Sequence, residues 1–289
     1  MVVDLTFRGR RIVRDRALVM AIVNRTPDSF YDKGATFAPD AALEAVRRAI
    51  GDGADIIDIG GVRAGPGIDV DATEEARRTV PFVEVVRTEF PDAVVSIDTW
   101  RADVAAGCLA AGADIVNDTW AGHDRNILLA TAEAGAGYVC SHTGGAEPRT
   151  RPHRVTYEDV VKSVVADTAA LAEEALAVGV PRSGVLIDPT HDFGKNTWHG
   201  LELIRRCSEL VATGWPVLMA LSRKDFIGET LDLPPDERLE GTLAATALAA
   251  AAGCAVFRAH DVVATRRVLE MVASIAGKRP PARPERGLV

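Results

Sequence analysis

Short runs of β-branched and aliphatic residues recur along the chain, and each run ends at or just before a polar residue. The segments between them carry apolar residues at helical spacing, most clearly in 40–50, 73–89, 157–176 and 237–252. Such alternation predicts parallel strands joined by right-handed helical crossovers. The expected strands are 18–23, 56–59, 94–97, 115–116, 138–140, 185–187, 217–221 and 255–257.

Eight strands of this kind are the number that closes a (β/α)8, or TIM, barrel, and this α/β barrel is the predicted fold. Residues 4–13, with Arg8-Gly9-Arg10 at their centre, predict a β-hairpin that closes the barrel floor. A doubly wound open sheet would give the same alternation, but it would not predict polar residues at every strand end. We expect one domain over 1–277 and a flexible tail over 278–289, which is rich in Pro and Arg.

Acids and amides follow three of the expected strands: Asp98, Asn117 and Asp188. Functional groups of such barrels gather at the carboxyl ends of the strands, so these three are expected to converge on one rim. A carboxylate can accept both hydrogen bonds from the paired N–H donors of an aminopyrimidine ring, and Asp188 is predicted to do so. For any one of them alone, the alternative is ordering a loop or capping a helix.

A group of cations also lies at or just beyond strand ends, namely Lys195, Arg223, Lys224 and Arg258, together with His260. The loops after strands 7 and 8 of such barrels often bind phosphate, and 222–224 and 258–260 occupy these two places. The pattern predicts a diphosphate ligand. Arg258 could also lay its planar guanidinium over a heteroaromatic ring. An isolated cation is more often a solvated surface group, so this prediction depends on the clustering.

Composition narrows the class of protein. A net charge of −8 and a pI near 5.3 argue against nucleic acid or an anionic membrane as a partner. Four scattered cysteines without a C-x-x-C pair favour a reducing cytoplasm over a disulfide framework or a zinc site. Several arginines precede the apolar run 17–23, as in a short signal peptide. Polar residues follow this run, however, where a signal peptide would have small residues at its cleavage site. No run approaches the roughly 20 apolar residues of a membrane helix.

Residues 20–30, which read Met-Ala-Ile-Val-Asn-Arg-Thr-Pro-Asp-Ser-Phe, resemble the first signature of the dihydropteroate synthase family. Further segments similar to that family follow in order at 53–61, 96–99, 117–118, 188–189, 193–195, 222–224, 226–228 and 258–261. The resemblance spans nearly the whole chain. It implies a cytoplasmic transferase of folate biosynthesis that joins a pterin diphosphate to p-aminobenzoate, with Mg²⁺, and releases pyrophosphate. Sulfonamide and sulfone analogues of p-aminobenzoate are then candidate ligands.

The resemblance also implies roles for individual residues. The pterin would be held by Asp98, Asn117, Asp188, Lys224 and Arg258. The diphosphate would be attended by Asn24, Arg258 and His260, and Asn24 would also contact the Mg²⁺. The aminobenzoate side would be formed by Phe193, Ser222 and Pro66.

The loops after strands 1, 2, 5 and 6 depart from the family pattern. After strand 2 the chain reads Gly-Val-Arg-Ala-Gly-Pro-Gly over 61–67, where the family has Gly-Glu-Ser-Thr-Arg-Pro-Gly, so Gly65 replaces an arginine. Losing such a contact to a departing anion typically costs about a hundredfold or more in rate. The other departures are Ala64 in loop 2, Arg25, Tyr31 and Lys33 in loop 1, Ser141-His142-Thr143 in loop 5, and Thr190 and Asp192 in place of two glycines in loop 6.

The leading hypothesis is a dihydropteroate synthase homologue that keeps a pterin and diphosphate pocket but has weak or no synthase activity. One alternative is an active synthase in which Arg25 or Arg63 compensates for the missing arginine. Others are a non-catalytic pterin-binding or regulatory protein, and a pterin-binding methyltransferase, although no cobalamin module is attached. The alanine-rich segment 242–252 has almost no charge, which predicts either a homodimer contact or a tightly packed outer helix.

Overall fold

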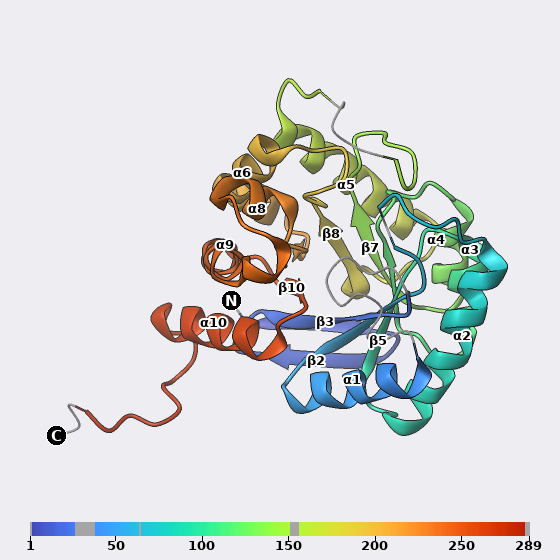
Figure 1. The fold of residues 1–289 in the computed structure, drawn as a ribbon, viewed down its shortest axis with the longest axis horizontal. Coiled ribbons are helices and arrows are strands. Elements are labelled where there is room, and N and C mark those ends of the chain that lie inside the picture. Colours follow the sequence, from blue (N-terminus) through green and yellow to red (C-terminus); the bar gives the residue numbers. More distant parts are fainter. Residues whose placement is uncertain (1, 27–37, 64, 151–155, 287–289) are drawn as a thin grey trace.

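The structure is a computed structural model that describes residues 2–26, 38–63, 65–150 and 156–286. Eight parallel strands alternate with helices and curl into a nearly closed barrel, as predicted (Figure 1). The strands are β3 (Leu18–Asn24), β4 (Ile56–Gly60), β5 (Val94–Asp98), β6 (Ile115–Asp118), β7 (Gly137–Ser141), β8 (Val185–Asp188), β9 (Leu218–Met219) and β10 (Val256–Ala259). The helices are α1 (Pro39–Gly51), α2 (Ala72–Glu89), α3 (Ala102–Ala110), α4 (Asn126–Glu133), α5 (Val160–Ala177), α6 (Thr197–Arg205), α7 (Cys207–Val211), α8 (Asp225–Leu231), α9 (Leu239–Ala252) and α10 (Val262–Ile275).

The strand order distinguishes a barrel from an open sheet. The hydrogen-bonded order is β8-β7-β6-β5-β4-β3-β10-β9, so the first and last strands of the alternation are neighbours, with Leu18 opposite Val256. The remaining seam is joined by a parallel bridge between Ile187 and Val217, and the Ile187 N–H donates to the Pro216 carbonyl at 3.0 Å. An open doubly wound sheet would leave this seam unjoined.

The two-residue alternation of the strands explains where the polar groups lie. In β4, Ile57 and Ile59 pack outward in the cluster that includes the helices, whereas Ile56 belongs to a separate cluster inside the barrel. Because side chains alternate, Asp58 faces the interior two residues above Ile56. The interior is therefore apolar near the floor and polar at the carboxyl ends of the strands. The other polar residues that face the interior, each two or four positions after an apolar interior residue of its strand, are Ser96, Asp98, Asn117, Asp188 and Arg258.

The predicted floor hairpin is present. Strand β1 (Val3–Phe7) pairs antiparallel with β2 (Arg10–Arg14), and the turn uses left-handed backbone at Arg8 (φ 49°) and Gly9 (φ 81°). Phe7 is fully buried against Gly137 at the start of β7. A Cβ on Gly137 would lie 2.6 Å from the Phe7 ring, so only glycine admits the hairpin this close.

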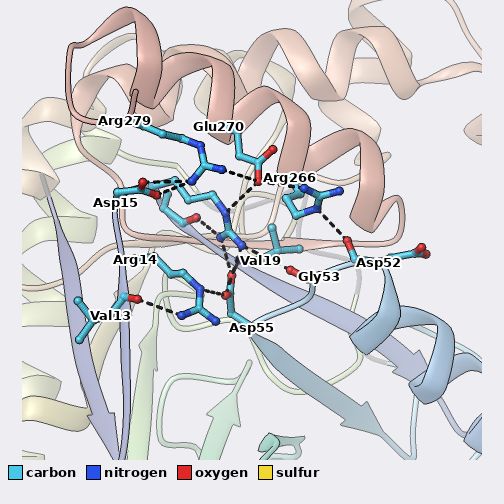
Figure 2. A network of polar contacts seen from close by, with 12 residues as sticks. Val13, Arg14, Asp15, Val19, Asp52, Gly53, Asp55, Arg266, Glu270 and Arg279 are labelled. Carbon is cyan, nitrogen blue, oxygen red and sulfur yellow. Dashed lines mark hydrogen bonds and ion pairs between the residues drawn. The ribbon is translucent and has the colours of Figure 1, made fainter. Parts of the chain in front are cut away.

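A network of ion pairs fastens the hairpin to the barrel and to α10. Buried Asp55 accepts from Arg14 at 2.8 Å, from Arg16 at 2.6 Å and from the Val19 N–H at 2.9 Å. Arg279, just beyond α10, donates to Asp15 at 2.8 Å. Figure 2 shows Glu270 of α10 beside this pair. The segment that follows the hairpin is therefore bound to the segment that follows α10.

After α10 the chain extends away from the barrel (Figure 1). The flexibility expected of residues 278–289 stays a prediction, although Arg279 is held by its ion pair. Among the residues described, none of the helices combines the length and the apolar character that crossing a bilayer requires.

Candidate functional site

A cavity of about 760 Å³ opens at the carboxyl ends of the strands. Every residue to which the sequence analysis gave a binding role lines this one cavity. They are Asn24, Pro66, Asp98, Asn117, Asp188, Phe193, Ser222, Lys224, Arg258 and His260. The expectation that these groups converge on one rim is therefore confirmed, while what each of them binds stays a prediction.

Arg258 is held between two buried carboxylates. Its Nε donates to Asp58 Oδ2 at 2.6 Å, and its Nη2 donates to Asp98 Oδ2 at 2.8 Å. The amide of Asn117 also donates to Asp58 Oδ2, at 3.2 Å, and the Thr119 hydroxyl donates to Asp98 Oδ1 at 3.2 Å. Burial raises the pKa of Asp98 to about 7, against the opposing effect of the Arg258 charge. The guanidinium is thus fixed in one place.

Two oxygen atoms of this group have no partner among the described residues. Asp58 Oδ1 and Asn117 Oδ1 are both buried and lack a hydrogen bond. Buried acceptors are rarely left unpaired, so this part of the site favours a ligand that brings N–H donors. Asp58 is a site residue that the sequence analysis did not assign. Asp58 lies two residues after Ile56 in the same strand, and this spacing could have predicted that its side chain faces the barrel interior.

Asp188 ends β8 and is 2% exposed. Its Oδ1 accepts from the backbone N–H of Thr190 at 2.7 Å. Burial raises the pKa of Asp188 to about 6, and the Thr190 N–H and the charge of Lys224 limit the rise. The group is therefore mostly a carboxylate at neutral pH, as an acceptor of two donor bonds must be.

The loop after β8 has a constrained backbone. Thr190 has φ of 52°, a left-handed conformation that is uncommon for a β-branched residue, and it stands where the family pattern has glycine. Lys195 Nζ donates to the carbonyls of His142 at 2.8 Å, Phe193 at 2.9 Å and Thr190 at 3.2 Å. Burial lowers the pKa of Lys195 to about 7. Lys195 therefore ties the loops after β7 and β8 together.

Asp192, the second loop residue that replaces a glycine of the family, forms an ion pair within the cavity. Its Oδ2 lies 3.2 Å from Lys224 Nζ. The same ammonium group lies 5.2 Å from the centre of the Phe193 ring, within cation–π range. Lys224 is therefore engaged on one side by a carboxylate that the family pattern lacks.

The residues of the two segments expected to bind phosphate, 222–224 and 258–260, do not all face the cavity in the same way. Ser222 Oγ lies 2.9 Å from His260 Nδ1, and burial followed by the nearby Arg258 charge lowers the pKa of His260 to about 3. His260 is thus a neutral imidazole. Arg223, in contrast, makes two bonds to Asp261 at 2.9 and 3.0 Å and donates to the carbonyls of Pro235 and Asp236. It organises the backbone behind the rim.

An apolar cluster beside the cavity was missed by sequence reasoning. Trp120 meets Phe193 edge-to-face at 4.8 Å and Trp100 at 6.5 Å, and Val62 and Val70 of the loop after β4 pack on them. The buried Trp120 Nε1 has no partner among the described residues. Nothing in the local sequence signals this cluster, because it joins loops after four different strands.

The structure describes some of the residues that depart from the family pattern in the loops after β3 and β4. The guanidinium of Arg25 lies 5.0 Å from the Phe82 ring of α2, and its Nε donates to the Arg78 carbonyl at 3.4 Å. Arg63 and Gly65 line the cavity. Among the described residues, a Cβ on Gly65 would meet only the Arg63 side chain within 4 Å, at 3.9 Å. Tyr31, Lys33 and Ala64 lie outside the described residues.

Within the described part of the chain, no cluster of three or more His, Cys, Asp or Glu side chains is arranged to hold a metal ion. The oxygen donor assigned to Mg²⁺ by the resemblance, the Asn24 amide, lies at the end of β3 near Asp98 across Gly60. Mg²⁺ commonly keeps several waters and takes few protein ligands beside substrate phosphates. The donors present fit such an ion, bound mainly through a diphosphate.

Comparisons with known proteins agree on one family. The sequence pattern of the family described as "Pterin binding enzyme" matches residues 20–260. The chain is 63% identical to a protein of Mycobacterium tuberculosis (strain ATCC 25618 / H37Rv) named "Inactive dihydropteroate synthase 2", over 98% of this chain and 90% of that protein. It is 38% identical to "Dihydropteroate synthase" of Bacillus subtilis (strain 168), over 92% of this chain and 90% of that protein.

Solved structures give the same result. The crystal structure of the Yersinia pestis dihydropteroate synthase, described as a sulfonamide drug complex, superposes with a TM-score of 0.90. The sequence identity is 33%, and the alignment covers 96% of this chain and all of that one. The barrel therefore follows the fold of that protein.

Proposed function

This chain belongs to the pterin binding enzyme family as a homologue of dihydropteroate synthase, and from this we propose that it binds a pterin and a diphosphate but has weak or no synthase activity. The observation that carries the proposal is the single cavity lined by Asp98, Asn117, Asp188 and Arg258. The reduced activity is supported by the missing guanidinium at Gly65 and by the ion pair between Asp192 and Lys224.

The pterin is placed with its paired N–H donors toward Asp188, whose carboxylate accepts both. Asn117 Oδ1, buried and without a partner among the described residues, would take a further donor. Arg258 lies across the cavity floor between Asp58 and Asp98, where its flat guanidinium can face the ring. This assigns the fused ring to the deep end of the cavity.

The diphosphate is placed at the rim, near Asn24, Arg258 and His260. Mg²⁺, when bound there, would neutralise charge on the diphosphate oxygens, with Asn24 as the protein ligand. The neutral imidazole of His260, held by Ser222, would donate or accept one hydrogen bond without adding charge. A ring such as p-aminobenzoate or a sulfonamide analogue would then lie beside Phe193, Ser222 and Pro66.

The proposed weakness of the transfer reaction has a direct test. The purified protein with pterin diphosphate, p-aminobenzoate and Mg²⁺ is expected to release pyrophosphate at least about a hundredfold more slowly than the Bacillus subtilis enzyme assayed beside it, because a cation that faces the departing anion is absent. Gly65→Arg restores that cation, and a Cβ at position 65 would meet only Arg63 among the described residues, at 3.9 Å. It is expected to raise the rate by about tenfold.

Equal rates for the two proteins would contradict the proposal and favour the second candidate, an active synthase. That candidate is supported by Arg63, which lines the cavity two residues before Gly65. Rescue of a bacterial strain without its own synthase would separate the two candidates in cells. A non-catalytic pterin-binding or regulatory protein would show stabilisation by the pterin with no turnover at all.

Pterin binding is expected to weaken in acid. Asp188 must be a carboxylate to accept two donors, and burial raises its pKa to about 6. Below that pH the free protein holds a proton that binding must release, so the Kd of 6-hydroxymethylpterin should rise by about tenfold per pH unit. Calorimetric titration from pH 7.5 to 4.5 measures this, with a ligand that carries no titrating phosphate. A flat profile over this range would contradict the assigned role of Asp188.

We also propose that the protein forms a homodimer and is located in the cytoplasm. Leu248 of α9 and Met271 and Ile275 of α10 are exposed apolar residues on two helices that pack against each other. A second copy would cover such a face. The four cysteines are buried free thiols, which fits a reducing compartment.

A further inference from the structure

We propose that Asp192 is a specificity-determining residue that turns the subsite beside Phe193 away from aromatic carboxylates and toward neutral aromatic amines. This inference rests on the proposed function, because it names the class of second ligand for the same cavity. It begins from one contact, the 3.2 Å ion pair between Asp192 Oδ2 and Lys224 Nζ.

The subsite has walls that suit a flat aryl ring. Phe193 and Trp120 are packed edge-to-face, with ring centres 4.8 Å apart and planes at 87°. Both line the cavity, and both are nearly buried, with 9% and 2% of their surfaces exposed. Such a corner offers apolar contact to an aromatic ligand without reading its charge. The charged groups around it must therefore decide which ring substituent is accepted.

Lys224 lies at this corner, with its ammonium nitrogen 5.2 Å from the Phe193 ring centre. An aromatic carboxylate that approached it would compete with Asp192, which already pairs with it at the cavity wall. The side chains of Lys224 and Asp192 are only 16% and 27% exposed, so water screens their attraction less than at an open surface. The carboxylate of a ligand would have to displace Asp192 and would then lie beside it with the same charge.

Of the other cations that line the cavity, Arg223 is bonded to Asp261, and two more also have their own partners. Lys195 donates to three backbone carbonyls, and Arg258 bridges Asp58 and Asp98. Neither can turn to a ligand carboxylate without leaving these buried acceptors unpaired, which is costly. A neutral substituent such as a carboxamide avoids the conflict, because its N–H group donates to Asp192 while Lys224 stays in place.

The experiment compares two ligands that differ by one charge, p-aminobenzoate and p-aminobenzamide. Each is titrated calorimetrically into the full-length protein, alone and again with 6-hydroxymethylpterin present, which cannot undergo transfer. The wild-type protein is expected to bind the amide about tenfold more tightly than the carboxylate. In Asp192→Asn the ratio of the amide affinity to the carboxylate affinity should fall to one or below. Lys224 would then be unpaired, and no negative charge at residue 192 would repel the ligand carboxylate.

Glu229→Gln is the matched control, since Glu229 is another carboxylate that lines the same cavity and is held by the Thr197 hydroxyl. It should leave the ratio within about twofold of wild type, because an exposed, separately bonded charge contributes little. Thermal unfolding without ligand should give the wild-type midpoint for both variants, which shows that they are folded, and Glu229→Gln should also bind 6-hydroxymethylpterin as the wild type does.

Several results would overturn the inference. These are a wild-type preference for the carboxylate, an unchanged ratio in Asp192→Asn, an equal shift in Glu229→Gln, or no binding of either aryl ligand to any variant. The pterin titration separates these results from a failure of the proposed function. Loss of pterin binding in the wild type would end the proposed function, whereas intact pterin binding with an unchanged ratio would end only the role of Asp192.

Discussion

Replacing Arg258 by methionine is expected to lower the free energy of unfolding by about 3–5 kcal/mol, the usual cost of removing one partner from a buried ion pair. Asp58 is fully buried and Asp98 nearly so, and both bond to this guanidinium at 2.8 Å or less. Methionine fills a similar volume but offers no donor, so two carboxylates would share an apolar space without a cation. Urea denaturation at pH 8, where Asp98 is ionised, measures the loss.

The loss should shrink as the pH falls below 7, because a protonated Asp98 is cheaper to bury. Arg47→Met gives the comparison, since Arg47 makes a similar pair with Glu89 on the exposed surface of α1. Its cost should stay within about 1 kcal/mol. Equal losses in the two variants would contradict a central role for Arg258 in holding the cavity together.

Replacing Asp188 by asparagine is expected to weaken 6-hydroxymethylpterin binding by about a hundredfold to ten-thousandfold, because two charge-assisted bonds of roughly 1.5–3 kcal/mol each are lost. The amide would also present its own N–H group to the donors of the ring. The fold should survive, since an amide oxygen can still accept from the Thr190 N–H. Calorimetric titration at pH 7.5 measures the affinity, and thermal unfolding without ligand checks stability.

The control for this change is Asp225→Asn. Asp225 also lines the cavity, but it lies on α8, is largely exposed and pairs with Arg238. Its replacement should alter the Kd by less than about threefold. If Asp188→Asn weakened binding no more than Asp225→Asn, the ring would have to be recognised elsewhere in the cavity.

Much of the rim could be predicted from sequence because it depends on two local regularities. The first is the strand repeat of two residues, which places Asp98, Asn117 and Arg258 on the same face as buried residues two positions earlier. The second is that parallel strands deliver their carboxyl ends to a common edge. Together they bring residues from distant parts of the chain to one cavity without any knowledge of loop structure.

The loops could not be predicted in this way, because their contacts depend on neighbours that are remote in sequence. The replacement of a glycine by Asp192 was visible, but its pairing with Lys224, in the loop after the next strand, was not. The sequence grouped Arg223 with the candidate phosphate ligands. In the structure its guanidinium instead donates to Asp261 and to two backbone carbonyls. A run such as Ser-Arg-Lys does not reveal which cation turns inward.

The pairing of β3 with β10 has a consequence for how the protein is made. The strand that starts at Leu18 lies beside the one that starts at Val256, and Asp15 is bonded to Arg279. A ribosome must therefore synthesise the chain as far as β10 before the ring of strands can close, and until then β3 presents an unpaired edge to other growing chains. Shielding of that edge by a chaperone would be most valuable late in translation, when seven strands have emerged and the eighth has not.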